Sequence, residues 1–235
     1  MRIVVLAKPV PDATGQERLR SDGRLERSAA PAVLNGNDEY TLEAALRLVD
    51  AHGGEVTLVA MAPSEARDAL RKGLAMGATR AVLVSDERLA GSCTLSTMLV
   101  LAATLRTLDF DLVLAGAAAI DEAGTNAIHV RRISGAGQET VEVPLPALVV
   151  GTQLLGEPRY PTLKGIMGSR AKEIAVRTLA DLGLAEATVG GGSATTVVVA
   201  QRTPAARTAA RIVRGTAEAA AREVVDFLVE RRALR

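Results

Sequence analysis

The 235-residue chain carries 28 basic and 27 acidic side chains, so it has no net field that would attract nucleic acid or an anionic membrane. Aromatic residues make up only 2% of the sequence, which excludes the stacking platforms of single-strand binders and predicts a core of Val, Leu, Ile and Ala. The single cysteine, Cys93, excludes an internal disulfide, and because no targeting signal or membrane span is recognisable we expect a cytoplasmic protein.

Apolar runs of strand length alternate with helical patterns in the first half of the chain. Strands are expected at residues 3–7, 56–61, 81–84 and 110–115, and helices at residues 38–52, 64–77 and 94–105. Asp22-Gly23 predicts a small hairpin before the first helix, which Asn37 or Asp38 would cap. The alternation predicts an α/β fold, a parallel sheet with helices on both faces. Ligands bind such sheets beyond the carboxyl ends of the strands, where the strand order reverses.

The stretch 110–126, FDLVLAGAAAIDEAGTN, combines a buried strand with a turn of small residues. Gly116 and the alanines after it leave no bulk above the carboxyl end of the strand, so a ligand could approach the backbone. Asp121, Gly124, Thr125 and Asn126 supply turn and cap chemistry where free N–H groups attract phosphate. The same residues would also make a turn without a ligand, because they match neither a P-loop nor a GxGxxG fingerprint. Both interpretations stay open on this evidence.

The second half of the chain is less regular. It contains a predicted hairpin at 131–143, strands at 147–150, 173–177 and 196–200, a long turn-rich segment at 157–172, a basic run at 202–214 and a helix at 218–229. A loop as long as 157–172 in a compact domain is either functional or disordered. The basic run has too few apolar side chains to pack alone and could lie on another chain. We therefore divide the chain into an α/β nucleotide-binding core, residues 1–185, and a C-terminal linker, arm and helix, residues 186–235.

Catalytic constellations are missing from the sequence. No acid or cysteine stands at ligand or triad spacing to His52 or His129, so both histidines are expected to be structural or solvated. Cys93 begins a helix, where the pKa of its thiol could fall, but a small buried side chain is the simpler role. The residues alone thus indicate an α/β protein with a possible nucleotide site and no chemistry of its own.

Five segments carry a resemblance to a known family. In chain order they read NGNDEYTLEAALRL, KGLAMGATRAVLV, LVLAGAAAID, LPALVVGTQLLGEPRYPTLKGIM and TLADLGL. They resemble the β subunit of electron-transfer flavoprotein, also called the small or FixA-type subunit, over nearly the whole chain. The resemblance implies a flavodoxin-like or adenine-nucleotide-hydrolase-like fold and a heterodimer with an α subunit, on which residues 186–235 would pack.

The same resemblance implies a carrier of electrons rather than an enzyme. The α subunit would hold most of an FAD that lies close to this chain. That flavin would pass electrons from flavin-dependent dehydrogenases to a quinone-reducing or other acceptor. The chain's own nucleotide would be AMP, or a second FAD in the bifurcating branch of the family. Neither nucleic acid nor membrane insertion is expected.

The resemblance also assigns site residues by position. The implied cofactor contacts are Leu6, Asn35, Gly36, Asn37, Asp38, Met61, Gly116, Ala119, Ile120, Asp121, Gly124, Thr125, Asn126 and Ala127. The implied partner-recognition residues are Arg159, Tyr160, Leu163, Ile166 and Met167, and Leu163 matches the apolar anchor that enters a dehydrogenase pocket. We call residues Arg159–Met167 the recognition segment. From the residues alone, Leu163 could equally fold back onto the C-terminal helix.

The chain departs from the family pattern in several places. The family reads Asn-Pro where this chain has Asn35-Gly36, and the Gln that follows the acidic nucleotide loop is absent. Ala13 stands where an aromatic residue approaches the flavin, and the lysines after the recognition segment are reduced to Arg170 and Lys172.

A larger departure lies between Asn126 and Arg131, where related chains continue through a full helix and another strand. Either the chain is naturally shortened or a segment is missing from the sequence. We favour a missing segment, because losing a helix from one face of a parallel sheet would expose its apolar side.

Two other classes of protein share parts of this pattern. A stand-alone adenine-nucleotide-binding regulator of the universal-stress type would have the same alternation of strands and helices. It would not need the recognition segment or the basic arm. A nucleotide-using ligase or transferase would need a phosphate motif and a catalytic residue, and neither is visible.

Overall fold

The computed structural model describes residues 1–12, 20, 22, 25–26, 30–116, 122–123, 127–135, 137–196, 199–200 and 212–233. The chain forms two compact units, Met1–Val199 and Ala200–Arg235. The first unit includes residues 186–193, which the sequence analysis grouped with the C-terminal extension. Val189 from this stretch is buried in a small cluster with Val84, Leu89 and Leu179.

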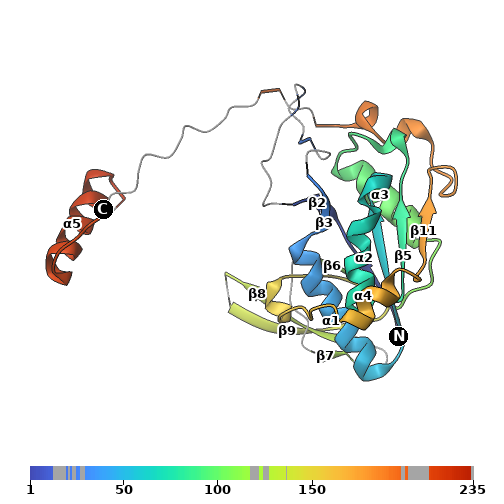
Figure 1. The fold of residues 1–235 in the computed structure, drawn as a ribbon, viewed down its shortest axis with the longest axis horizontal. Coiled ribbons are helices and arrows are strands. Elements are labelled where there is room, and N and C mark those ends of the chain that lie inside the picture. Colours follow the sequence, from blue (N-terminus) through green and yellow to red (C-terminus); the bar gives the residue numbers. More distant parts are fainter. Residues whose placement is uncertain are drawn as a thin grey trace. The chain divides into compact units, whose positions relative to one another are not determined.

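A six-stranded sheet forms the centre of the first unit, and every pair of neighbouring strands in it is parallel (Figure 1). In spatial order the strands are β10 (Ala147–Gly151), β6 (Leu112–Gly116), β1 (Arg2–Leu6), β4 (Glu55–Met61), β5 (Arg80–Val84) and β11 (Ile174–Arg177). The predicted α/β class is confirmed. The four inner strands, β6, β1, β4 and β5, are apolar along most of their length because side chains on both of their faces are covered.

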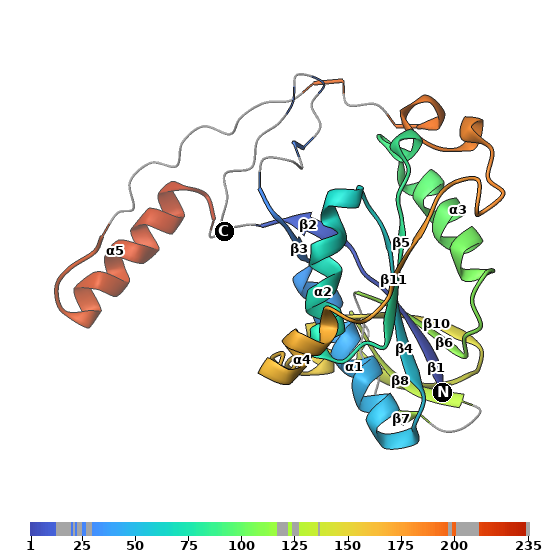
Figure 2. The same ribbon diagram turned by 45° about the vertical axis from the view of Figure 1, so that its right-hand side comes forward.

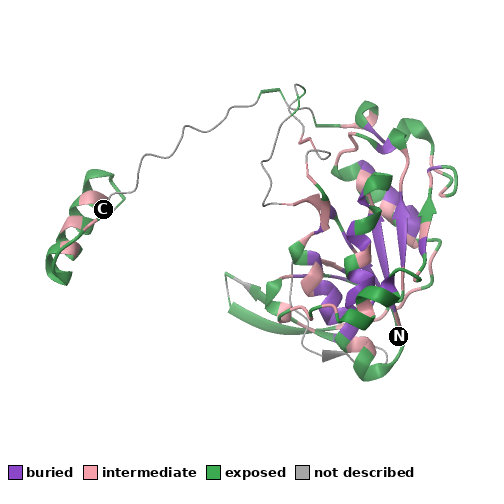
Figure 3. Cartoon of the chain, viewed as in Figure 1, coloured by how far each residue is buried: buried purple, intermediate pink, exposed green. Residues whose placement is uncertain are grey.

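Helices α1 (Gly36–His52) and α2 (Arg67–Met76) cover one face of the sheet, and α3 (Thr94–Leu105) lies over the other (Figure 2). On the α1 side, Ile3, Leu58 and Leu112 belong to the main core. On the α3 side, Val4, Val59, Val82 and Val113 form a separate cluster against Leu101 and Leu105. This division follows from the strand period of two, since neighbouring side chains point to opposite faces. Figure 3 shows the buried residues concentrated in the sheet and beneath these helices.

The strand order places a topological switch point beside β1. The chain runs from β1 through β4 to β5 in one direction and then returns to the other side of β1 with β6. Open α/β sheets bind ligands at such a reversal, beyond the carboxyl ends of the strands. The ends of β1 and β6 and the start of α1 are therefore the expected place for a site.

Short strands complete the first unit. Strands β2 (Pro9–Pro11) and β3 (Ala32–Leu34) pair antiparallel, so they bracket the stretch in which a hairpin was predicted. Strands β7 (Glu122–Ala123), β8 (Ala127–Ser134) and β9 (Gly137–Pro144) form a separate antiparallel sheet. The predicted hairpin at 131–143 is confirmed and is longer than expected. The 3-10 turns span Ser64–Ala66, Glu87–Leu89, Gln153–Leu155, Glu186–Thr188 and Gly191–Ser193.

Among the residues that the structure describes, none covers the α3 side of β10. The chain moves in the same direction across the sheet from β5 to β6 and from β6 to β10. Right-handed connections would therefore place both crossovers on the face that α3 covers. The described part of the connection instead packs Ile128 into the α1-side core. On β10, Leu148 and Val150 are consequently 62% and 44% exposed. The apolar face of β10 is thus exposed, as the sequence analysis expected.

Three sequence predictions are wrong in detail. Helix α1 begins at Gly36 after Asn35, so neither Asn37 nor Asp38 is its cap. Residues 196, 199 and 200 are not in a strand. Most of the recognition segment is not an extended loop, because Leu163–Ser169 form helix α4, which Thr162 caps by accepting a hydrogen bond from Gly165 N.

The second unit contains helix α5, Ala217–Glu230, as the sequence predicted. Thr216 caps it, and none of its residues is buried. Its apolar side chains Val224, Val225 and Val229 remain exposed. Residues 201–211, which include most of the basic run predicted at 202–214, lie outside the described residues.

Candidate functional site

The carboxyl ends of β6, β1 and β4, together with the start of α1, form what we call the switch-point edge. Leu6 ends β1 and pairs with Ala115 of β6 on one side and Val59 of β4 on the other. Gly116 and Met61 end those two neighbouring strands. Three of the predicted cofactor contacts therefore lie at the ends of adjacent strands.

Helix α1 begins against this edge. Asn35 N donates to Lys8 O over 3.0 Å, and Asp38 N donates to Asn35 O over 2.9 Å. The side chain of Asp38 is buried, and its Oδ2 accepts a hydrogen bond of 2.6 Å from Lys8 N. Burial raises the pKa of the Asp38 carboxyl, and the Lys8 N–H opposes that rise. Asp38 thus joins the end of β1 to the first turn of α1.

Gly116 fits this junction because it has no side chain. A Cβ at Gly116 would lie 2.6 Å from Asp38 Oδ1 and 3.2 Å from the backbone of Asn37. Gly36, by contrast, has no atom within 4 Å of the position where a Cβ would stand, and both Gly36 and Asn37 are exposed. The open part of the switch-point edge is therefore the first turn of α1, where the N-terminus of a helix favours an anion.

The other predicted cofactor contacts are placed differently. Ala127 begins β8 and pairs with Pro144 in the antiparallel sheet. Met61 is half-buried against the cluster that contains Val84. Six predicted contacts lie outside the described residues: Ala119, Ile120, Asp121, Gly124, Thr125 and Asn126.

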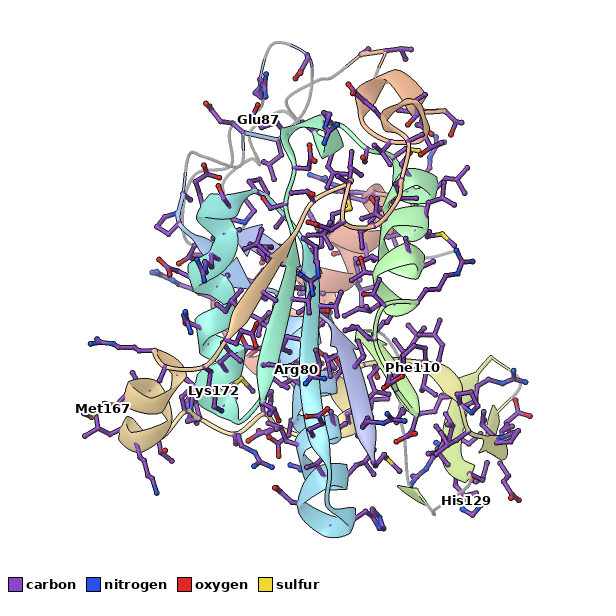
Figure 4. All side chains as sticks on the ribbon, turned by 90° about the vertical axis from the view of Figure 1, so that its right-hand side faces the viewer. Arg80, Glu87, Phe110, His129, Met167 and Lys172 are labelled. Atoms are coloured by element: carbon purple, nitrogen blue, oxygen red, sulfur yellow. The ribbon has the colours of Figure 1, made fainter. Side chains whose placement is uncertain are left out.

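The recognition segment presents a group of apolar side chains to solvent. Tyr160, Leu163 and Met167 are 93%, 74% and 66% exposed, and Ile166 is also exposed. In Figure 4, Met167 points away from the domain at the end of α4. Large apolar side chains that gather at the surface mark sites of interaction. Leu163 is therefore not part of the core of its own unit.

Helix α2 holds α4 in place. Arg71 Nη1 donates to Ser169 O over 2.5 Å and to Lys172 O over 2.7 Å. Lys172 Nζ in turn donates to Leu74 O and Ala78 O at the end of α2. Gly165 lies so close to α2 that a Cβ there would be 2.4 Å from Ala75 O. The exposed side chains are thus carried by a short helix with fixed neighbours.

Arg159 differs from the rest of the recognition segment because it is bonded within its own domain. It forms ion pairs with Glu43 and Asp50 of α1. The sequence analysis missed Glu43. Its role could have been suspected because Glu43 stands next to Leu42 and Ala44–Leu46 on the buried side of the predicted helix. A buried carboxylate there needs a basic or hydrogen-bonding partner.

The remaining reactive side chains do not form a catalytic group among the described residues. Backbone N–H groups, first of all that of Ser96, lower the pKa of the half-buried Cys93 to about 6. Within the described part of the chain, no three His, Cys, Asp or Glu residues are grouped so as to hold a metal ion. None of the helices there is long and apolar enough to cross a membrane.

Comparison with known proteins decides the family. The model of the electron transfer flavoprotein domain matches residues 22–127. The electron transfer flavoprotein subunit beta of Mycobacterium tuberculosis (strain ATCC 25618 / H37Rv) is 35% identical over 260 aligned positions, which cover 97% of each chain. The chain belongs to the electron-transfer flavoprotein β subunits.

Other members of the family are similarly close. The β subunit of Thermoanaerobacterium thermosaccharolyticum is 33% identical and covers 98% of this chain and 99% of its own. The CarD subunit of the caffeyl-CoA reductase–Etf complex of Acetobacterium woodii is 33% identical, with 92% and 93% covered. These matches support an electron-transfer role and do not support the universal-stress alternative.

The alignment with the M. tuberculosis β subunit is longer than this chain. The M. tuberculosis alignment has 260 positions, whereas the whole of this chain has 235 residues, so that β subunit has at least 25 positions without a counterpart here. The match to the domain model ends at Ala127.

Proposed function

We propose that this β subunit docks flavin-dependent dehydrogenases through its recognition segment, with Leu163 as the anchor. The observation that carries the proposal is the group formed by Tyr160, Leu163, Ile166 and Met167, which is apolar, exposed and fixed to α2. Apolar anchors that fill a partner's pocket give small interfaces much of their affinity. A fixed anchor binds more tightly than a mobile one because less conformational freedom is lost on binding.

The proposed assembly is a heterodimer. An α subunit holds most of an FAD close to the β subunit, and electrons pass through this flavin from the dehydrogenase to a quinone-reducing or other acceptor. The β subunit supplies surfaces and a nucleotide site and no catalytic residues. Residues 186–235 divide between the two units, and the arm and α5 pack on the α subunit. The apolar side of α5, with no buried residue, supports that role.

The proposed nucleotide of the β subunit is AMP or a second FAD, bound at the switch-point edge. The exposed first turn of α1 at Gly36 and Asn37 would receive a phosphate, and the small residues that begin at Gly116 would let the ligand approach the sheet. Leu6 and Met61 would flank it. The predicted contacts from Ala119 to Ala127 belong to the same proposal.

The proposal is tested by co-expressing the chain with its α subunit. The heterodimer should purify with a yellow flavin, and a flavin-dependent dehydrogenase with its substrate should bleach the flavin absorbance. The α subunit alone should be reduced more slowly by the same dehydrogenase, because it lacks the recognition segment. Equal rates with and without the β subunit would contradict the docking role.

A further inference from the structure

We propose that Arg159 is a positioning residue: it fixes the start of the recognition segment to helix α1, through Glu43, and does not itself contact the dehydrogenase. This inference rests on the proposed docking role of the recognition segment. It changes the role of Arg159 from the partner contact that the family resemblance implied to a residue that positions the segment. The other four predicted recognition residues keep their roles as contacts.

The bonds between Arg159 and Glu43 use both oxygens of one carboxylate. Arg159 Nε donates to Glu43 Oε2 over 2.7 Å, and Nη2 donates to Oε1 over 3.2 Å. The backbone N of Arg159 also donates to Oε2, over 3.1 Å. Two parallel bonds of this kind fix the orientation of a guanidinium as well as its position. The third bond fixes the main chain at the residue before Tyr160.

Glu43 belongs to the interior of the domain. Its side chain is 4% exposed, whereas that of Arg159 is 35% exposed. Burial on its own raises the pKa of Glu43, but the hydrogen bonds from Arg159 and Arg47 and the charge of Arg159 together outweigh that effect, so the net pKa is lowered. A buried carboxylate of this kind cannot contact a docking protein. Its partner Arg159 is therefore directed inward, away from the surface that carries Leu163.

The chain just before Arg159 is bound to the same side of α1. Arg47 Nε donates to Glu43 Oε1 over 2.8 Å, and its Nη2 donates to Glu157 O over 3.2 Å. A Cβ at Gly156 would lie 2.8 Å from Arg47 Nη1, so the main chain passes directly against this side chain. Arg159 Nη2 also donates to Asp50 Oδ2 over 2.8 Å, about two helical turns beyond Glu43 along α1.

The recognition segment is thus held at two ends by two different helices. Arg159 ties its start to α1, and Arg71 of α2 binds Ser169 O just after its end. Leu163 lies between these attachments. Loss of the Arg159 attachment would let the first half of the segment move while α4 stays against α2. Tyr160 and the chain that leads into Leu163 would then lose conformational freedom on docking, which weakens affinity without changing the chemistry at the flavin.

Two variants separate positioning from direct contact. If Arg159 acts through Glu43, then Arg159→Ala and Glu43→Gln should each raise the KM for the heterodimer, by about three- to ten-fold, with kcat unchanged. The double variant should be no worse than the worse single one, because both changes remove the same attachment. Arg159→Lys, which keeps the charge but not the paired bonds, should behave like Arg159→Ala. Direct contact instead predicts an effect of Arg159→Ala alone.

Hydrogen exchange supplies a readout that does not depend on the donor. The backbone amides of Tyr160, Thr162 and Leu163 should exchange faster in Arg159→Ala and Glu43→Gln than in the wild-type heterodimer, with flavin content unchanged. Asp50→Asn is the matched control, because Asp50 is exposed and binds only one nitrogen of Arg159. It should change neither KM nor exchange measurably. If Glu43→Gln does not assemble, exchange and KM in Arg159→Lys decide the question.

The outcomes distinguish this inference from the proposed function. If Leu163→Ala leaves KM unchanged, the docking role of the segment is wrong, whatever Arg159 does. If Leu163→Ala raises KM while Glu43→Gln has wild-type KM and exchange, the docking role stands and the positioning role of Arg159 is overturned. A rise in KM with both variants, together with faster exchange at Tyr160, Thr162 and Leu163, supports the inference.

Discussion

Replacement of Leu163 by alanine should weaken docking of the dehydrogenase and leave the heterodimer otherwise intact. Fully burying a leucine side chain is worth about 1.5–3 kcal/mol. Leu163 is 74% exposed in the free chain, so about three quarters of that gain, roughly 1.1–2.2 kcal/mol, is still available on docking. At about 1.4 kcal/mol for each factor of ten, the apparent affinity should fall by about 6- to 40-fold.

The assay is the rate of flavin bleaching in the purified heterodimer, at a series of heterodimer concentrations with catalytic dehydrogenase. Leu163→Ala should raise KM and leave both kcat and the thermal midpoint of unfolding unchanged. Leu148→Ala is the matched control, because Leu148 has a similar exposure but lies on the α3 side of the sheet. Wild-type saturation of Leu163→Ala would refute the reasoning, as would an equal loss of docking in Leu148→Ala. A lower thermal midpoint of unfolding for Leu163→Ala would show that Leu163 packs in the core and is not a docking anchor.

Three further predictions follow from the same contacts. Gly116→Ala should destabilise the fold by about 1–3 kcal/mol in denaturant unfolding and release nucleotide, because the new Cβ would meet Asp38; Gly36→Ala, in open space, should not destabilise it. Deletion from Gln201 onward should abolish heterodimer formation with the α/β core still folded by circular dichroism; normal assembly would count against the role of the arm. Arg159 lowers the pKa of Glu43 below its ordinary 4.5 despite burial, so the stability gained is present above about pH 4.5 and lost as pH falls through the folded pKa. Glu43→Gln should therefore lose less stability than wild type on acidification, and equal acid sensitivity would contradict this.

Much of the fold could be predicted from periodicity. The parallel strands were visible as apolar runs because they are buried on both faces, and the carboxyl-edge site follows from their alternation with helices. The short helix α4 was missed because Pro161 just before it and Gly165 within it are turn formers. Gly165 has no side chain, so α4 can lie close to Ala75 of α2. This contact joins distant parts of the chain and therefore cannot be read from the local sequence.

The sequence predicted which residues lie near the candidate site, but not which partners Asp38 and Arg159 bind. Asp38 was assigned to the ligand as part of a contiguous run, yet its carboxylate is buried and bonded to Lys8 N. Arg159 was assigned to the partner for the same reason, yet it pairs with Glu43, which lies 116 residues away in the sequence. Such pairs depend on which helix faces which loop, so sequence pattern alone cannot assign them.

The switch-point edge also depends on one residue that pattern reasoning did identify. Gly116 was singled out because small residues permit close approach of a ligand. In the structure the first close neighbour of Gly116 is Asp38 of its own chain. The glycine therefore has a structural reason in addition to the proposed one. Gly36, where no neighbouring atom lies close, is the better candidate for contact with a phosphate.

The central claim is that the β subunit holds a nucleotide of its own in addition to the flavin shared with the α subunit. The most direct measurement is to denature the purified heterodimer and to identify and count the nucleotides released by chromatography. We predict two per heterodimer: one FAD, and either one AMP or a second FAD. Release of one FAD and no other nucleotide, from a heterodimer that its dehydrogenase reduces normally, would contradict the claim.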